Sequence, residues 1–176
     1  MGSPKALLPF GGETMLQRVV RLLGDVVSPL VVVAAPDQAL PVLPASVVVT
    51  RDEREGRGPL EGLRAGLTAL PGDIEMAYVT SCDVPLLVPA FVDRMVALLG
   101  DDDIAVMEID GFPHPLSAVY CRRTLPHVEA LLAADRLRPV FLFDAVRTRR
   151  VSPAEMTAAD PELLTLRNLN TRQDYL

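Results

Sequence analysis

The stretch "LVVVAAP", residues 30–36, places an unbroken apolar run directly before a proline. Valine is β-branched and favours strands, and a run that is apolar at every position is typical of a strand buried on both faces of a parallel sheet. Helices must then cover both faces of that sheet. The stretch therefore predicts an α/β fold, with a strand over residues 30–35 and Pro36 closing it.

Segments with helical and strand-like patterns alternate around this run. Apolar residues at helical spacing mark the expected helices, and Thr14 is the expected N-cap of the first one. The helices are expected over 14–23, 59–70, 89–99, 124–133 and 139–145, and the strands over 30–35, 46–50, 76–80, 104–109, 116–121 and 147–151. This alternation predicts a Rossmann-like, doubly wound, mostly parallel sheet with flanking helices, in a single domain over residues 1–176.

Composition excludes several classes of protein. The apolar runs are broken well before the roughly 18 residues that a membrane span needs, and no secretory signal pattern is present. We therefore expect a cytoplasmic protein with no membrane partner. The net charge of -6 argues against broad nucleic-acid binding, so a phosphorylated ligand would have to be held by a local group of cations.

The cysteines and histidines do not form a metal-binding pattern. Cys82 and Cys121 are far apart in sequence, and His114 and His127 add no cluster, so a structural zinc site is not expected. Cys82 could be a nucleophile, but it has no histidine nearby in sequence, and the neighbouring Asp83 would raise its pKa, which favours a packing role. His114 either lines a substrate pocket or ends a turn.

Ligands of doubly wound sheets bind outside the carboxyl ends of the strands, and two aspartates occupy such places. Asp83 follows the strand expected over 76–80 and could hold Mg²⁺, which needs only one or two carboxylates beside substrate phosphates and water. It could equally cap the turn or the following helix. Asp52 follows the strand expected over 46–50, where its carboxylate could accept from ribose hydroxyls or a base N–H.

The loop after Asp52 leads into a helix that starts at Gly58-Pro59 with free N–H groups. Arg51, Arg54 and Arg57 in this region could pair with phosphate, although a solvated loop of mixed charge is the simpler interpretation. The glycines over 56–62 do not match the dinucleotide fingerprint, because their spacing is wrong and they follow a charged loop.

Lys5 stands in "MGSPK" and is the only lysine among 17 basic residues. In a chain that uses arginine elsewhere, a lysine here suggests a need for a compact ammonium, although a chance exposed lysine is the alternative. The segment reads as the second half of a phosphate-binding loop. It is not a kinase-type P-loop, because Gly-Lys followed by Ser or Thr is absent.

Five segments in order resemble the MobA-type molybdenum cofactor guanylyltransferases of the nucleotidyltransferase superfamily. They are "MGSPKALL" (1–8), "GPLEGL" (58–63), "CDVPLL" (82–87), "HPLSAVY" (114–120) and "NLNT" (168–171). Each is weak alone, but the ordered set is specific to the superfamily, whose fold is GT-A-like. Asn168 and Asn170 favour the guanylyl type, because cytidylyl relatives tend to have aspartate at these places.

The resemblance implies a Mg²⁺-dependent enzyme that transfers GMP from GTP to the phosphate of molybdopterin and releases pyrophosphate. It implies that Lys5 contacts the GTP phosphates, that Asp83 is the magnesium ligand, and that Asp52 binds the nucleotide, with Lys5 and Asp83 as the catalytic pair. As partners we expect the two substrates, transient contacts with other molybdenum cofactor proteins, no nucleic acid, and a monomeric state.

Two alternatives stay open at this point. The first is a cytidylyltransferase or another nucleotidyltransferase of the same fold. The second is a non-catalytic binding protein that kept the fold, which would show little nucleotide affinity and no pyrophosphate release.

Three departures separate the sequence from the family pattern. The pattern begins with a strand and a Leu-Ala-Gly-Gly-x-Ser-x-Arg loop ahead of Met-Gly, and both are missing here, while Ala34 replaces a common asparagine and Arg172 a common proline. The missing strand would lie at the centre of the sheet and leave two unpaired inner edges. We therefore expect the translated chain to be longer at its N-terminus, with Met1 an internal methionine.

Overall fold

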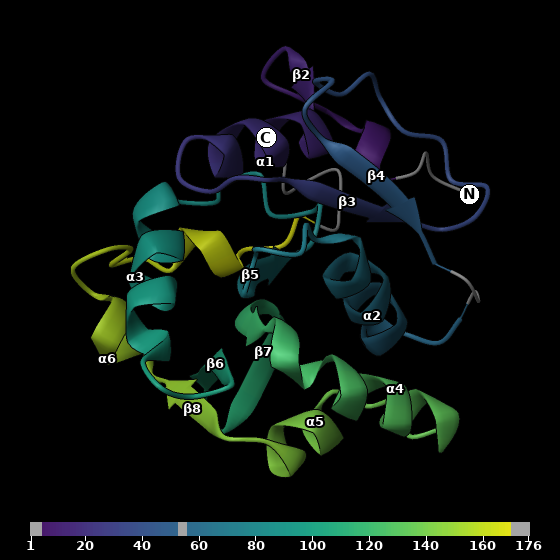
Figure 1. Cartoon of the computed structure of the whole chain (residues 1–176). Helices are drawn as coiled ribbons and strands as arrows, with labels where there is room; N and C mark the ends of the chain where they lie inside the picture. The colour runs from purple at the N-terminus through teal and green to yellow at the C-terminus, as the bar shows by residue number, and fades with distance from the viewer. Residues whose placement is uncertain (1–4, 53–55, 170–176) are drawn as a thin grey trace.

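Strands and helices alternate along the chain in the computed structural model, which describes residues 5–52 and 56–169. The strands form a central layer between two layers of helices (Figure 1). They are β1 (Pro9–Phe10), β2 (Glu13–Thr14), β3 (Val31–Ala34), β4 (Val48–Arg51), β5 (Met76–Thr80), β6 (Ile104–Ile109), β7 (Phe112–Cys121) and β8 (Thr148–Val151). The helices are α1 (Met15–Gly24), α2 (Pro59–Ala69), α3 (Pro89–Leu99), α4 (Leu125–Ala133), α5 (Val140–Ala145) and α6 (Pro153–Met156), with three short 3₁₀ turns.

The strands form a mixed arrangement, which confirms the α/β class. One sheet has the order β5-β7-β6-β8, in which β7 is antiparallel to β5 and β6, and β8 is parallel to β6. A separate parallel pair joins β3 to β4, and β1 with β2 forms a small hairpin. The direction reverses at β7 because Asp110 and Gly111, both at positive φ, make the tight turn that leads out of β6.

Alternating side chains of the central strand β6 show how the two helical layers are held. Ile104 and Val106 pack with α2, α4 and α5, whereas Ala105 and Met107 pack with α3 and α6. All four are fully buried, as the period of two along a strand requires when both faces are covered. Figure 1 shows α3 and α6 on one side of this sheet and α2, α4 and α5 on the other.

A capping box sets the start of α1. The Thr14 hydroxyl accepts a hydrogen bond from the Gln17 N–H at 3.3 Å, and the Gln17 side-chain oxygen accepts from the Thr14 N–H at 2.9 Å. Two donors that the helix leaves unpaired are thereby satisfied. The predicted N-cap is confirmed.

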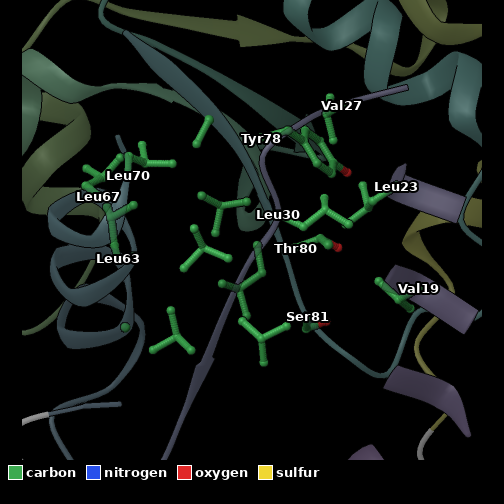
Figure 2. Close-up of a pocket in the computed structure, with 18 of the residues that line it drawn as sticks. Val19, Leu23, Val27, Leu30, Leu63, Leu67, Leu70, Tyr78, Thr80 and Ser81 are labelled. Carbon is green, nitrogen blue, oxygen red and sulfur yellow. The ribbon is translucent and has the colours of Figure 1, made fainter. Parts of the chain in front are cut away.

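β3 differs from the expectation of a strand buried on both faces. Val31, Val32 and Val33 are only partly buried, because β3 has a partner on one edge and β5 does not pair with its other edge among the described residues. A cavity of about 590 Å³ lies between β3 and β5. Figure 2 shows the side chains that line it.

No helix among the described residues is long and apolar enough to cross a membrane.

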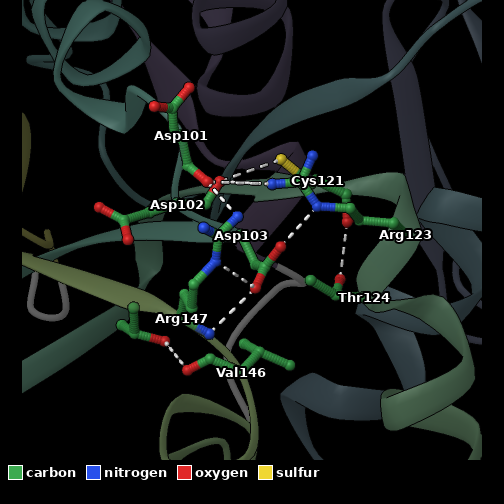
Figure 3. A network of polar contacts seen from close by, with 9 residues as sticks. Asp101, Asp102, Asp103, Cys121, Arg123, Thr124, Val146 and Arg147 are labelled. Atoms are coloured by element: carbon green, nitrogen blue, oxygen red, sulfur yellow. Dashed lines mark hydrogen bonds and ion pairs between the residues drawn. The ribbon is translucent and has the colours of Figure 1, made fainter.

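An ionic network fastens the sheet at the amino end of β6 (Figure 3). The Asp103 carboxylate accepts from the Arg123 side chain and, at 3.0 Å, from the Arg147 N–H. The two guanidinium groups in turn donate to the carbonyl oxygens of Asp101 and Asp102. The hydrogen bond from Arg123 is the main reason that the pKa of Asp103 is lowered, against the opposing effect of burial.

We expect Asp103→Ala to lower the free energy of unfolding at pH 7 by no more than about 1 kcal/mol, the upper range for ion pairs near solvent. Because the folded pKa is lowered, this contribution is complete above the ordinary carboxyl pKa of about 3.9 and is lost as the pH falls through the folded value. Urea unfolding followed by circular dichroism checks this. The free energies of unfolding of Asp103→Ala and of the unsubstituted protein should converge in acid. Asp101→Ala is the control, because Asp101 takes part through its carbonyl oxygen. An equal loss in the control would contradict the assignment.

Candidate nucleotide site

Lys5 and Asp83 form an ion pair at the carboxyl end of β5. The Lys5 ammonium donates to Asp83 Oδ2 at 2.7 Å, although the residues are 78 positions apart. Lys5 belongs to a 3₁₀ turn, Lys5–Leu7, anchored through Ala6, which is buried in an apolar cluster with α1. The Lys5 side chain is 45% exposed and that of Asp83 only 11%, so the ammonium covers the carboxylate from the solvent side.

Asp83 is held by two further contacts. The Ser81 hydroxyl donates to Oδ1 at 2.6 Å, and the Leu169 N–H donates to the Asp83 carbonyl oxygen at 2.9 Å. Burial alone would raise the pKa of Asp83, but the hydrogen bonds from Lys5 and Ser81 and the charge of Lys5 outweigh it, and the pKa is lowered. Asp83 is therefore an ionised carboxylate at neutral pH.

The alternative role of Asp83 as a helix cap is not seen. The next helix, α3, begins at Pro89 with Val88 as N-cap and has no side-chain cap. The Asp83 side chain instead accepts from Lys5 and Ser81. Its carboxylate is thus directed to the end of the strand, where a ligand could reach it.

A single ionised carboxylate suits one kind of metal site. No group of three or more His, Cys, Asp or Glu side chains that could hold an ion occurs within residues 5–52 and 56–169. Mg²⁺ does not need such a cage, because it commonly binds through one or two carboxylates and takes its remaining ligands from substrate phosphates and water. Asp83 fits this way of binding. It does not fit a site in which protein side chains alone surround the ion.

Asp52 lies directly after β4, where its N–H donates to the Ala34 carbonyl oxygen at 2.9 Å. Its Oδ1 is buried and has no hydrogen-bond partner among the described residues. Burial and then the charge of Glu61 raise the pKa of Asp52, against the opposing charge of Arg64. A buried acceptor without a partner costs free energy, which a donor from a ligand would recover.

The first turns of α2 lie beside Asp52. A Cβ placed on Gly62 would be 3.7 Å from Asp52 Oδ1. Gly58, the N-cap, has a φ of 70°, and no side chain caps the helix start, so its N–H groups are not bound by a capping side chain. Asp52, Gly58 and Cys82 line the same cavity, which places the ends of β4 and β5 around one space.

Cys82 and His114 are the two remaining candidates. Burial and the Asp83 charge raise the pKa of the Cys82 thiol, as its neighbour predicts, so Cys82 is a poor nucleophile. His114 lies in β7 opposite Met107, not in a turn, and burial lowers its pKa.

The predicted arginines of the loop are engaged by the protein itself. Arg51 donates to the Ala35 carbonyl oxygen at 2.6 Å. Arg57 donates to the Leu132 carbonyl oxygen and lies 3.4 Å from Asp135. Both side chains are therefore bound within the protein, and Arg54 lies outside the described residues.

Comparison with known proteins fits this geometry. The MobA-like NTP transferase domain matches residues 1–149. This chain belongs to that family. A molybdenum cofactor guanylyltransferase from Desulfosudis oleivorans is 32% identical over 174 residues, which are 98% of this chain and 84% of that protein. A probable molybdenum cofactor guanylyltransferase from Methanosarcina acetivorans is 36% identical over 97% of this chain and 80% of that protein.

Solved structures support the fold of this MobA-like NTP transferase domain. Molybdopterin-guanine dinucleotide biosynthesis protein A from Archaeoglobus fulgidus superposes with a TM-score of 0.78 at 16% identity, over 97% of this chain and 86% of that one. A 2-C-methyl-D-erythritol 4-phosphate cytidylyltransferase from Thermus thermophilus gives 0.71 at 18% identity, over 99% and 91%. This chain therefore shares its fold with both of these proteins.

Two parts of the site were not foreseen from the sequence of this family member. Ser81 holds the second oxygen of Asp83, and Leu169 binds its backbone. The only signal for Leu169 was its place in "NLNT", while Ser81 carried none beyond being next to "CDVP". Asn168 is exposed, and Asn170 lies outside the described residues.

We expect the thiol of Cys82 to react slowly with a disulfide reagent at pH 8, because its raised pKa keeps it protonated. In the Cys121→Ser variant the remaining thiol reports on Cys82 alone, and urea should restore the rate of an ordinary cysteine. Absorbance of the released thiolate measures both rates. Equal rates in the folded and unfolded protein would refute the packing role.

Proposed function

We propose that this chain transfers GMP from GTP to the phosphate of molybdopterin, with release of pyrophosphate. The observation that carries the proposal is the Lys5–Asp83 pair at the carboxyl end of β5, where an ammonium and an ionised carboxylate lie 2.7 Å apart at the edge that binds ligands in open α/β sheets. The names of the relatives, molybdenum cofactor guanylyltransferase, support guanylyl transfer to this cofactor.

Lys5 is assigned to the triphosphate. Its side chain is 45% exposed, and its ammonium already lies at the edge of the sheet, so it can contact a phosphate oxygen while it stays close to Asp83. In a protein of net charge -6, such a local cation is needed to hold a polyanion. Negative charge that develops on the leaving pyrophosphate would be stabilised by the same ammonium.

Asp83 is assigned to Mg²⁺. The ion would supply charge neutralisation between the phosphate oxygens, which is its usual role in phosphoryl transfer. Ser81 and Leu169 keep the carboxylate in place for this purpose, since they bind its second oxygen and its carbonyl group. Asp83 here is a ligand and not a base, because its lowered pKa makes it a weak proton acceptor.

Asp52 is assigned to the nucleoside. Its unpartnered Oδ1 is a ready acceptor for a ribose hydroxyl or a base N–H, and its place beside the start of α2 leaves uncapped N–H groups close by. With the nucleotide fixed at both ends, the pterin phosphate can attack the α-phosphorus in line. Positioning of this kind, and not covalent chemistry, supplies most of the rate.

The same fold also carries cytidylyl transfer, so the base is assigned from the relatives' names. We retain the expectation of a cytoplasmic monomer.

Lys5→Ala and Asp83→Asn should each lower the rate of pyrophosphate release by about 10²- to 10³-fold, the usual effect of removing one group that stabilises transition-state charge. Ser81→Ala should lower it only roughly tenfold, since it removes one hydrogen bond and leaves the carboxylate. A coupled pyrophosphate assay with GTP, Mg²⁺ and molybdopterin measures all three.

The matched control is Arg149→Ala. This variant breaks the ion pair between Arg149 and Glu155, whose length of 2.8 Å is close to that of the Lys5–Asp83 pair. Arg149 lies on β8 at the far edge of the sheet, so the variant should keep full activity. Circular dichroism should show each variant folded. Unchanged pyrophosphate release by the Lys5 and Asp83 variants would remove both residues from the site.

GTP with Mg²⁺ should raise the thermal midpoint of unfolding more than CTP with Mg²⁺ at equal concentration. The nucleotide that binds the folded protein more tightly stabilises it more. The increase with GTP should shrink in Asp52→Asn, which weakens the acceptor assigned to the nucleoside. Differential scanning fluorimetry gives the midpoints. A larger shift with CTP would favour the cytidylyltransferase alternative, and no shift with either nucleotide would favour a non-catalytic protein.

A further inference from the structure

The loop that carries Asp83 is bonded near both of its ends to one later segment of the chain. This loop, residues 81–88, joins β5 to α3. At its end the Val88 N–H donates to the Thr165 hydroxyl oxygen at 3.0 Å. Near its start the Asp83 carbonyl oxygen accepts from the Leu169 N–H at 2.9 Å. One short stretch of chain therefore sets the position of both ends of the loop.

Asp160 fixes the fold of that later segment. Asp160 and Thr165 are both buried. Asp160 Oδ1 accepts from the Leu164 N–H at 2.9 Å, and Oδ2 accepts from the Thr165 N–H at 2.9 Å and from the Thr165 hydroxyl at 2.7 Å. The two N–H groups belong to the first residues of the 3₁₀ turn Leu164–Leu166, where a helical turn leaves its donors unpaired. The carboxylate satisfies these donors and so holds the turn closed.

The Thr165 hydroxyl links the carboxylate to the loop. A hydroxyl has one hydrogen to donate and can accept through its oxygen at the same time. Here it donates to Asp160 and accepts from Val88, so the chain of bonds runs from a buried carboxylate to the residue that precedes α3. Valine in place of Thr165 would interrupt this chain of bonds at one atom.

Apolar contacts bring the same segment to the sheet. Leu163 and Leu166 pack against a cluster that contains Phe91 of α3, and Tyr78 of β5 packs against this cluster as well. Figure 1 shows the segment, in yellow, beside α3 and β5. Apolar packing is non-directional, so it does not by itself decide which backbone groups meet. The bonds of Asp160 and Thr165 supply that register.

The middle of the loop has anchors of its own. The Arg18 side chain donates to the Pro85 carbonyl oxygen at 2.6 Å, and Val84 and Leu87 are buried against α1. These contacts hold the loop on the molecule whether or not its ends are bonded. Loss of the Thr165 hydroxyl should therefore displace the ends of the loop without unfolding it.

Asp83 depends on the ends of the loop because its side-chain partners can move with it. Ser81 belongs to the same loop, and Lys5 reaches Asp83 through a flexible four-carbon stem. The Leu169 N–H, in contrast, is a backbone donor from outside the loop. A shift of the later segment is therefore passed to the Asp83 backbone and from there to its carboxylate.

We propose that Asp160 and Thr165 are positioning residues for Asp83. They hold residues 160–169 in the register in which Leu169 binds the Asp83 backbone and Thr165 binds the start of α3. Both act through the loop and not on the substrates, and both lie after residue 149, where the match to the family domain ends. This inference rests on the assignment of Asp83 to Mg²⁺ under the proposed function.

Thr165→Val removes the hydroxyl and keeps the shape of the side chain, so it separates the bonds from the packing. We expect the Mg²⁺ concentration for half-maximal pyrophosphate release to rise about fivefold, the effect of one lost hydrogen bond, with the rate at saturating Mg²⁺ kept within about twofold. Thr165→Ser keeps the hydroxyl and should restore the original Mg²⁺ requirement. An unchanged Mg²⁺ requirement in Thr165→Val would overturn the proposal.

The matched control is Thr124→Val. Thr124 is also buried, and its hydroxyl donates to the Cys121 carbonyl oxygen at 2.7 Å. It follows β7 at the end of the sheet where β5 begins, opposite to Asp83. Both valine variants should lower the thermal midpoint of unfolding by about 2–4 °C, but only Thr165→Val should raise the Mg²⁺ requirement. An equal rise in the two variants would assign the effect to stability and contradict positioning.

Hydrogen exchange at the Leu169 amide, read by NMR, is a readout independent of catalysis. We expect this amide to exchange about tenfold faster in Thr165→Val and in Asp160→Asn, whose NH₂ group replaces one acceptor oxygen, and at an unchanged rate in Thr124→Val. Equal exchange in all the proteins would refute the positioning role even where pyrophosphate is released. Absence of pyrophosphate release from the unsubstituted protein would instead contradict the proposed function, so the two failures are distinguishable.

The unsubstituted protein gives a further measurement that needs no variant. Binding is reciprocal, so a ligand that requires the loop to be fixed must also fix it. We expect the Val88 amide to exchange about tenfold more slowly when GTP and Mg²⁺ are bound than in the free protein. Equal exchange of this amide with and without bound GTP and Mg²⁺ would overturn the link between Thr165 and the metal site.

Discussion

A single buried carboxylate joins three distant parts of this chain. Asp83 follows β5, binds the Lys5 ammonium through one oxygen and the Ser81 hydroxyl through the other, and its carbonyl oxygen holds the Leu169 N–H. Burial disfavours its charge, and the hydrogen bonds from Lys5, from Ser81 and from its own backbone N–H, with the charge of Lys5, keep its pKa low. The contact with Lys5, which holds the N-terminal segment on the sheet, therefore also keeps a negative charge at the edge where open α/β sheets bind ligands.

Lysine has a specific advantage at such a place. Two unit charges about 4 Å apart attract by about 4 kcal/mol at an effective dielectric constant of 20, so a carboxylate and a phosphate near one ammonium compete for it strongly. A compact ammonium with three rotatable donors can serve both partners, whereas a planar guanidinium prefers one bidentate partner. Under the role proposed for Lys5, this accounts for the single lysine of a chain otherwise rich in arginine standing beside Asp83.

Local patterns predicted most elements, and β5, α3 and β6 were predicted with their observed bounds. β7 was expected from residue 116 but begins at Phe112. Pro113 has only β6 as a neighbouring strand, and a strand tolerates proline at a position with one free edge. The sequence also marked Lys5, Asp52 and Asp83 separately. Their mutual geometry could not be predicted, because it depends on how β4, β5 and the 3₁₀ turn at Lys5 pack, and no local period encodes that packing.

The cavity between β3 and β5 and the candidate site are parts of one arrangement. Asp52 and Cys82 line this cavity together with residues of β3 and β5, so the residue assigned to the nucleoside lies where these strands end around one space. Side chains of α2 pack with β3 and β5, and side chains of α1 pack with Tyr78 of β5, so these two helices help to fix the distance between the strand ends. Because positioning dominates phosphoryl transfer, the rigidity of this edge bears on catalysis as directly as the charges that it carries.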